Sequence, residues 1–96
     1  MSIISYLKLK PKPEFRKQFL QQLDELRKLA HNHPGYINSE VLHPDDDSDA
    51  YVILSEWETE DAFRHWEHSA RHQEVMDNYN DSTGEGYTKM RMERYR

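Results

Sequence analysis

The sequence contains no cysteine and no long apolar run. Without cysteine, the chain has no disulfide framework, no thiolate nucleophile and no thiolate metal site. No apolar segment approaches the roughly 20 residues that a membrane-spanning helix needs. The N-terminus shows no basic segment followed by an apolar one, so we expect no signal peptide. These absences predict a cytoplasmic protein that has no membrane partner.

Hydrophobic residues are also scarce, at 35% of 96 residues. A chain of this length forms one domain, residues 1–96, and by itself it can bury only a thin core. We therefore expect a homodimer, in which a twofold contact completes the burial of apolar surface. Basic residues number 13 against 18 acidic ones, which gives a net charge of −5. This balance disfavours nucleic acid as a partner, because a phosphate backbone attracts basic surfaces.

Hydrophobic periodicity predicts strands that alternate with helices. Apolar residues recur at helical spacing over residues 14–31, and the Pro34–Gly35 pair ends this helix. Thr59 and Ser69 are each suited to cap a short helix that follows. The predicted strands span residues 3–9, 36–42, 50–57 and 87–94. This order predicts an α+β fold of the ferredoxin-like type, βαββαβ, with a four-stranded antiparallel sheet and helices on one face.

The last predicted strand is rich in basic residues. Strict alternation along it predicts two faces, Tyr87, Lys89, Arg91 and Glu93 against Thr88, Met90, Met92 and Arg94. Basic residues on such a strand commonly discourage aggregation or pair with acidic neighbours. The alternative hypothesis is a clamp for an anionic substrate, formed by Lys89, Arg91, Arg94 and Arg96.

Large rings concentrate within residues 51–76. Trp57 closes a predicted strand, Phe63 and Trp66 lie in the helix that follows, and His72 lies in the next helix. This local geometry brings two indoles and an imidazole near one another. In a chain with so few apolar residues, they form either most of the core or the wall of a pocket, and the choice decides whether the protein is an enzyme.

A longer pattern surrounds these rings. The segment PGYINSEVL at residues 34–42 leads, through an alternating strand, to Trp57. The acidic helix ETEDAF, Trp66, Ser69 and His72 then follow in order. This stretch resembles the antibiotic biosynthesis monooxygenase (ABM) superfamily. The pattern of that family is a Pro-Gly turn into the second strand, a Trp that closes the third, and an acidic helix followed by a Ser and a His.

The resemblance implies a dimeric α+β barrel with a small-molecule pocket between the helices and the sheet of each protomer. It implies one of two chemistries, either oxidation of quinols or polyketide phenols by O₂ without a cofactor, or binding and cleavage of heme. The heme-degrading branch uses an Asn in the first strand, a Trp that Trp66 matches, and a His ten residues beyond it. Here that position is Met76, and the first strand has no Asn. The family's heme-binding triad is therefore incomplete in this chain.

For the cofactor-free reaction, His72 is the candidate catalytic base, because an imidazole has an ordinary pKa near neutrality. A phenol or enol must lose its proton before it can pass an electron to O₂, so the pocket must supply a base and exclude water. Flat rings would stack on the substrate, and a Tyr or Trp would add one polar group to an apolar wall. The predicted substrate-binding residues are Trp66, Phe63, Tyr6, Trp57, Tyr51 and Met76.

Three alternatives stay open from the residues alone. The first is heme as cofactor, with His72 in place of the missing ligand. The second is a module that binds a small ligand without catalysis. The third is a structural role, in which His72 is a hydrogen-bonded core residue and Trp57 plugs the rim of the barrel.

Two patterns suggest metal sites, and both are weak. Three imidazoles are spaced three and four residues apart (His65, His68 and His72), but Ser69 breaks the helix between them. Four acidic residues are spaced as in a calcium loop (Asp45, Asp47, Asp49 and Glu56), but Ala50 stands where that loop needs glycine. We therefore expect no metal, and the cofactor-free chemistry that the resemblance implies needs no organic cofactor.

Overall fold

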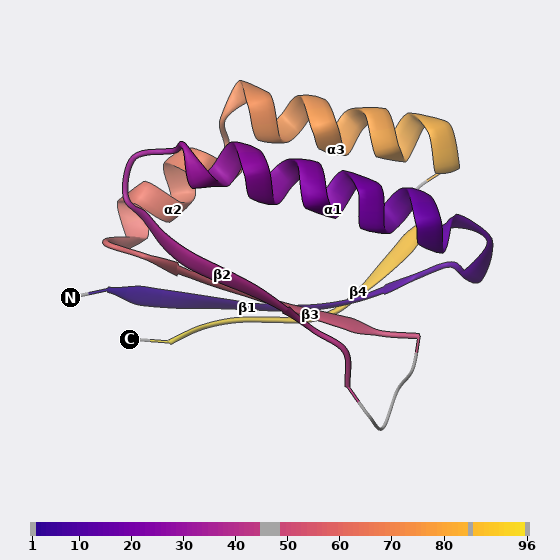
Figure 1. Ribbon diagram of the computed structural model, residues 1–96, viewed down its shortest axis with the longest axis horizontal. Helices are drawn as coiled ribbons and strands as arrows, with labels where there is room; N and C mark the ends of the chain where they lie inside the picture. Colours follow the sequence, from indigo (N-terminus) through magenta and orange to yellow (C-terminus); the bar gives the residue numbers. More distant parts are fainter. Residues whose placement is uncertain (1, 45–48, 85, 96) are drawn as a thin grey trace.

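The structure is a computed structural model that describes residues 2–44, 49–84 and 86–95. Its elements are, in chain order, β1 (Ile3–Pro11), a short 3₁₀ helix (Pro13–Phe15), α1 (Arg16–His31), β2 (Tyr36–Leu42), β3 (Tyr51–Trp57), α2 (Glu60–Glu67), α3 (Ala70–Thr83) and β4 (Tyr87–Tyr95). The strands form one antiparallel sheet in the order β2-β3-β1-β4. The α-helices all lie on the same face of this sheet (Figure 1). The ferredoxin-like α+β fold expected from the sequence is thus confirmed.

Alternation along the strands gives the sheet one face covered by helices and one open face. On the covered face, buried side chains pack in two clusters, one around Trp57 and the other around Phe19. The Trp57 cluster joins the start of β1 to α2 and the end of α1, whereas the Phe19 cluster joins Leu9 and Tyr51 to α1 and α3. The core therefore has two centres, one toward each end of the covered face.

Two side-chain caps set the starts of α2 and α3, as the sequence predicts. Thr59 Oγ1 accepts a hydrogen bond from the backbone N–H of Ala62 at 3.0 Å, and Ser69 Oγ accepts one from the N–H of His72 at 3.3 Å. Ser69 Oγ also donates to the carbonyl oxygen of Trp66 at 2.7 Å. One serine thus ends the helix that carries Trp66 and begins the helix that carries His72, so the two rings are brought together locally.

Gly35 lets the turn before β2 lie directly against α2. Its φ of +88° is in the region that favours glycine, and a Cβ placed there would lie 2.4 Å from the Cβ of Ala62. The backbone N–H of Glu58 donates to the Gly35 carbonyl oxygen at 2.8 Å, which ties the turn to the end of β3. The Pro34–Gly35 turn therefore fixes how closely α2 approaches the sheet.

The pairing of β1 with β4 corrects one prediction. The register shifts between Lys8 and Leu9, and beyond the shift Met92 lies opposite Leu7, while Arg94 lies opposite Ser5. An extra residue in β4 exchanges the faces of the side chains that follow it. Strict alternation was therefore wrong past this point, because Glu93 does not share a face with Lys89.

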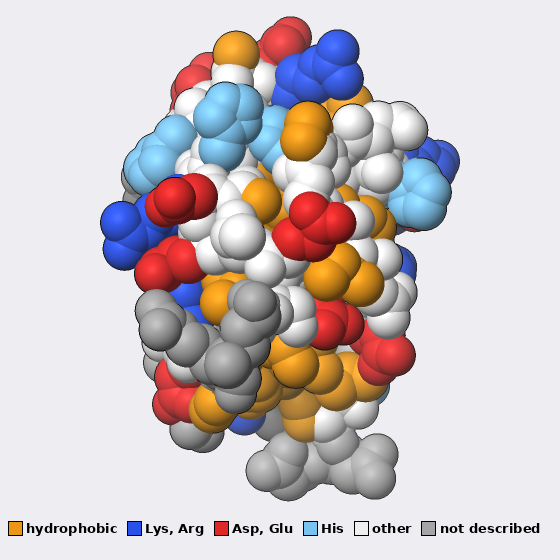
Figure 2. Space-filling model, turned by 90° about the vertical axis from the view of Figure 1, so that its left-hand side faces the viewer, with side chains coloured by type: hydrophobic (Ala, Val, Ile, Leu, Met, Phe, Trp, Pro, Cys, Tyr) orange, Lys and Arg blue, Asp and Glu red, His pale blue; other side chains and the backbone are white. Residues whose placement is uncertain are grey.

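The open face of the sheet carries apolar side chains that no part of the described chain covers. Ile4 and Tyr95 are neighbours across β1 and β4, and they are 40% and 46% exposed. Leu42, paired with Val52, is 43% exposed. Figure 2 shows hydrophobic side chains at the surface on the sheet side of the molecule, in its lower half. Among the described residues, no helix has the length and apolar character that a bilayer crossing requires.

Candidate functional site

A cavity of about 170 Å³ lies between the helices and the covered face of the sheet. A row of three serines, Ser39, Ser55 and Ser5, forms its floor, paired side by side across β2, β3 and β1. Serine side chains are short, so they leave space where larger residues would fill the interior. An apolar cavity of about 150 Å³ holds one benzene ring, so this cavity has room for a single substituted ring.

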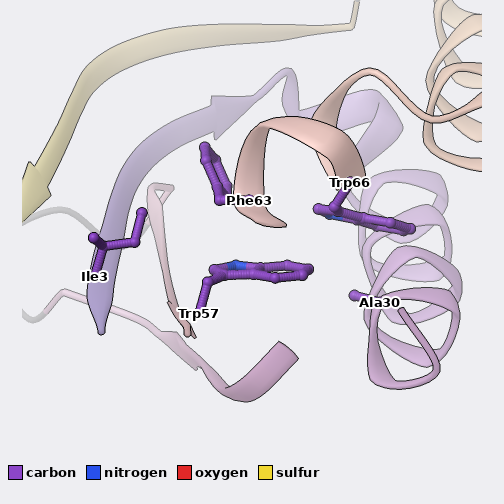
Figure 3. Close-up of a cluster of buried hydrophobic side chains, with 5 residues drawn as sticks. All are labelled: Ile3, Ala30, Trp57, Phe63 and Trp66. Atoms are coloured by element: carbon purple, nitrogen blue, oxygen red, sulfur yellow. The ribbon is translucent and has the colours of Figure 1, made fainter. Parts of the chain in front are cut away.

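The two tryptophans form one wall of this cavity. Trp57 is 1% exposed, and its ring centroid lies 6.3 Å from that of Trp66 at an interplanar angle of 22°. Figure 3 shows the two indoles roughly parallel and offset sideways, with Ala30 of α1 near Trp66 and Phe63 of α2 above Trp57. Trp57 Nε1 donates to Ser55 Oγ at 3.1 Å, so its polar group is satisfied within the sheet. These rings belong to the core and line the cavity at the same time.

His72 projects from the first turn of α3 and lines the same cavity. Its ring is half-buried and meets Trp66 edge-on, with centroids 5.2 Å apart and planes at 84°. Its Nδ1 is buried, and nothing in the described part of the chain forms a hydrogen bond with it. A buried nitrogen without a partner is unfavourable, and such a group in a native protein calls for an explanation.

Burial lowers the pKa of His72 below its ordinary value of 6.5, because the charged form loses its hydration. Glu67 raises the pKa of the same imidazole, whereas His68 and Lys89 lower it further. The result is a lowered pKa, so the ring is neutral at pH 7. It can therefore accept a proton without first having to lose one.

Arg94 does not form the anion clamp considered from the sequence. Its guanidinium lies 3.5 Å from Glu60 and 3.7 Å from Glu67, and it stacks over the Phe63 ring at 4.9 Å. Lys89 does line the cavity. The side chain of Arg91 and the whole of Arg96 lie outside the described residues, as do Asp45 and Asp47 of the calcium-like pattern.

Five of the seven predicted site residues meet at this cavity, namely His72, Trp66, Phe63, Trp57 and Met76. The two tyrosines do not. Tyr6 lies on the open face of the sheet, because it alternates with Ser5 and Leu7 along β1. Tyr51 is buried in the Phe19 cluster, where its hydroxyl accepts a hydrogen bond from Arg16 Nε at 2.7 Å. Period-two alternation already separated Tyr6 from Ser5, so the sequence carried the signal that excludes it.

Two polar residues of α1 also line the cavity and were not predicted. Gln22 is 9% exposed, and its Oε1 has no hydrogen-bond partner among the described residues. Arg27 donates from Nε to Ser39 Oγ at 3.2 Å and from Nη2 to the Ser39 carbonyl oxygen at 3.0 Å. Gln22 interrupts the apolar face of the helix between Phe19 and Leu23, a pattern visible in the sequence. Arg27 could be found only by knowing which strand lies beneath the helix.

Histidines gather at the end of the molecule where α2 and the end of α1 meet (Figure 2). Here His33 Nε2 lies 2.9 Å from His65 Nδ1, and the His33 ring centroid lies 5.4 Å from that of Trp66. Burial, followed by the positive charges of His65 and Arg71, lowers the pKa of His33. His65 thus lies against His33, which is not part of the His65, His68 and His72 pattern, whereas His72 lines the cavity. The histidines of that pattern do not come together. Within residues 2–44, 49–84 and 86–95, no three His, Cys, Asp or Glu side chains are placed to hold a metal ion.

A family model described as antibiotic biosynthesis monooxygenase matches residues 2–78. The chain belongs to this family. The matched segment runs from β1 into α3 and includes both tryptophans and His72, so the ABM membership expected from the sequence is confirmed. The match ends before β4.

Solved structures show the same fold across the whole ABM chain. A conserved protein from Methanosarcina mazei Go1 superposes with a TM-score of 0.86 at 21% identity, covering 100% of this chain and 92% of that one. SnoaB, a cofactor-independent oxygenase from Streptomyces nogalater, superposes with a TM-score of 0.80 at 14% identity, covering 99% of this chain and 91% of that one. At such identities, the likeness concerns the fold alone.

Proposed function

We propose that this ABM protein is a monooxygenase that oxidises an aromatic or enolisable small molecule with O₂ and without a metal or organic cofactor. One observation carries the proposal: the buried Nδ1 of His72 has no partner in the described chain and belongs to a residue lining a largely apolar cavity. A neutral imidazole at such a place is suited to take a proton from a substrate hydroxyl. The membership of the family and the cofactor-independent SnoaB among similar folds agree with it.

The proposed reaction begins when the substrate O–H gives its proton to His72. The resulting anion passes one electron to O₂, and the substrate radical and superoxide combine to form a carbon–oxygen bond. The peroxide takes a proton from the imidazolium. The neutral imidazole then removes the remaining hydrogen of the same carbon as a proton, the C–H electron pair forms the carbonyl, the O–O bond breaks, and the leaving hydroxide takes up that proton and departs as water. The balance is one CH₂ group and one O₂ giving one C=O and one H₂O, so the substrate supplies every electron.

The surrounding residues have roles that follow from their positions. Trp66, Phe63 and Trp57 present ring faces and edges to a flat substrate, and Met76 adds an adaptable apolar contact. The low polarity of this wall keeps water away from the anion and from superoxide. These four residues are the proposed substrate-binding set.

Heme, the alternative cofactor in this family, is less well supported by the cavity than a smaller ligand. A volume of about 170 Å³ is little larger than one that holds benzene. This volume favours a single ring over a macrocycle of four pyrrole rings. The proposed reaction therefore has no step on heme.

We also propose that the protein is a homodimer formed through the open face of the sheet. Exposed apolar side chains on this face include Leu42, which is paired with the buried Val52, and Ile4 and Tyr95, which are paired with each other farther along the sheet. A second copy placed on this face would remove them from water, which favours association. Sedimentation equilibrium at micromolar concentration is expected to give twice the chain mass of 11.6 kDa. A mass near one chain would contradict the dimer and leave the cavity argument unaffected.

Oxygen uptake tests the proposed function directly. Monocyclic hydroquinones, menadiol and anthrones are offered to the purified protein, treated with a chelator, in an oxygen-electrode cell. We expect O₂ consumption above the uncatalysed rate for at least one monocyclic member, with no requirement for added metal, flavin or hemin. If no member is turned over while one binds, the protein is a ligand-binding module and the oxygenase proposal is wrong.

A further inference from the structure

The guanidinium of Arg27 is fixed at the edge of the cavity floor. Its Nε and Nη2 donate to Ser39 Oγ and to the Ser39 carbonyl oxygen. The Tyr36 hydroxyl lies 2.8 Å from the same Ser39 Oγ, which helps to hold the serine in place. Neither bond to Ser39 uses Nη1. The planar group is therefore oriented by the protein while one of its edges keeps donors for something else.

No acidic side chain within residues 2–44, 49–84 and 86–95 forms an ion pair with Arg27. The cations that do pair with carboxylates include Lys28, Arg64, His68 and Arg94. The chain has 18 acidic residues against 13 basic ones, so carboxylates are plentiful elsewhere. The acidic residue that lines the cavity, Glu67, lies 3.7 Å from Arg94. A half-buried cation without a counter-charge is unfavourable, and an anionic ligand in the cavity would supply that charge.

Gln22 adds a second group that a ligand would satisfy. It lies on α1 with Arg27, lines the same cavity, and has a buried Oε1 without a partner in the described chain. A carbonyl oxygen can only accept a hydrogen bond, so its partner must carry an O–H or N–H group. His72 Nδ1 presents a further unsatisfied position on α3. The cavity therefore offers one binding position for an anion at Arg27, and two buried polar atoms without a partner in the described chain, Gln22 Oε1 and His72 Nδ1, belong to residues that line it.

We propose that the cavity binds a single-ring phenol or enol that carries a carboxylate, and that Arg27 holds this carboxylate through Nη1. Gln22 accepts a hydrogen bond from a ring hydroxyl, and a second hydroxyl faces His72. The ring chemistry rests on the proposed function, whereas the charge and the size of the substrate rest on Arg27 and on the cavity volume of about 170 Å³.

Lys89 is the other cation on the cavity wall, and the geometry favours Arg27. Lys89 is exposed on β4, and its ammonium is a mobile point charge on a flexible stem. Arg27 is half-buried and held by two hydrogen bonds, so its fork loses little freedom when it binds a carboxylate. The variant Lys89→Gln therefore tests whether Lys89, instead of Arg27, binds the carboxylate.

Binding is measured by calorimetry under argon, so that no turnover occurs. The probes are 2,5-dihydroxybenzoate and its neutral analogue 2,5-dihydroxybenzamide. The wild-type protein is expected to bind the acid about 10- to 100-fold more tightly than the amide, as is usual for a hydrogen bond to a charged group. Arg27→Gln is expected to lose most of this preference while it keeps the affinity for the amide. Lys28→Gln, which removes one charge from the next residue of α1, is expected to keep the preference.

Four results would overturn the proposal. They are equal affinity of the wild type for acid and amide, no binding of the acid below millimolar concentration, equal loss of both ligands in Arg27→Gln, and loss of the preference in Lys89→Gln instead. Because O₂ is absent, this experiment is independent of the oxygenase test. Turnover of neutral quinols without a preference for the acid would leave the proposed function standing and remove this inference.

Discussion

Replacement of His72 by glutamine is expected to lower the rate of O₂ consumption by about 10²- to 10⁴-fold, the usual contribution of a general base. Glutamine is polar and of similar length, but it cannot take up a proton at neutral pH. The backbone N–H that Ser69 caps is present in both proteins, so α3 should begin at the same place. The rate is measured with an oxygen electrode at saturating substrate, and KM is expected to change much less than kcat.

His68→Gln is the matched control for this variant. His68 ends α2 close to His72 in the chain, but its side chain is exposed and does not line the cavity. The control is expected to keep the wild-type rate. Normal turnover by His72→Gln would remove the base assignment, even if the protein proved to be an oxygenase.

The pH profile gives the same variant a second readout. Because burial lowers the pKa of His72 below 6.5, kcat/KM should rise through that lowered pKa and be level at neutral pH. His72→Gln should lack this rise of kcat/KM with pH.

The lowered pKa of His72 also makes the stability of the fold depend on pH. The unfolded chain binds the proton more readily than the folded one. The contribution of His72 to the free energy of unfolding is therefore fully present above pH 6.5 and is lost as the pH falls toward the pKa of His72 in the folded protein.

Replacement of Trp57 by alanine is expected to cost about 3 to 5 kcal/mol of unfolding free energy, the range measured for large buried rings. Trp57 is 1% exposed and contacts the rings of Tyr36, Phe63 and Trp66 at centroid distances of 5.5, 5.9 and 6.3 Å. A domain of this size has roughly 5 to 15 kcal/mol in total. The variant should therefore unfold at much lower urea concentration, as measured by far-ultraviolet circular dichroism.

Two companion variants make this result specific. Leu20→Ala removes an apolar side chain that is 39% exposed on α1, and it should change stability by less than about 0.5 kcal/mol. Trp57→Phe keeps part of the ring contact and should fall between the two. A loss below about 1 kcal/mol in Trp57→Ala would show that the indole is peripheral to the core.

The fold followed from the sequence because local rules agreed with one another. Alternation marked the strands, Pro34–Gly35 and the two caps marked the helix ends, and the element order left one common topology. The extra residue in β4 was missed, because a bulge leaves no mark in a strand without glycine or proline. Its position becomes visible only in the pairing with β1.

The site followed from the sequence only in part. Trp66 and His72 were placed together correctly, because a single serine joins their helices. Gln22 and Arg27 were missed, because a polar residue on a helix gains its meaning from the strand beneath it. The three serines of the cavity floor could not be predicted for a similar reason. They lie on three different strands and become neighbours only through the register of the strand pairing.

The register shift between β1 and β4 determines which side chains of β4 face the cavity, and therefore the charge there. In a perfectly regular ladder of the same residues, Glu93 would lie opposite Ser5, and Met92 would be turned to the opposite side of the sheet. A negative side chain would then face the cavity, and the contacts of Arg94 with Glu60 and Glu67 would be lost. Loss or gain of one residue near the C-terminus is thus a route by which related chains could change the charge that faces the cavity while the backbone topology stays the same.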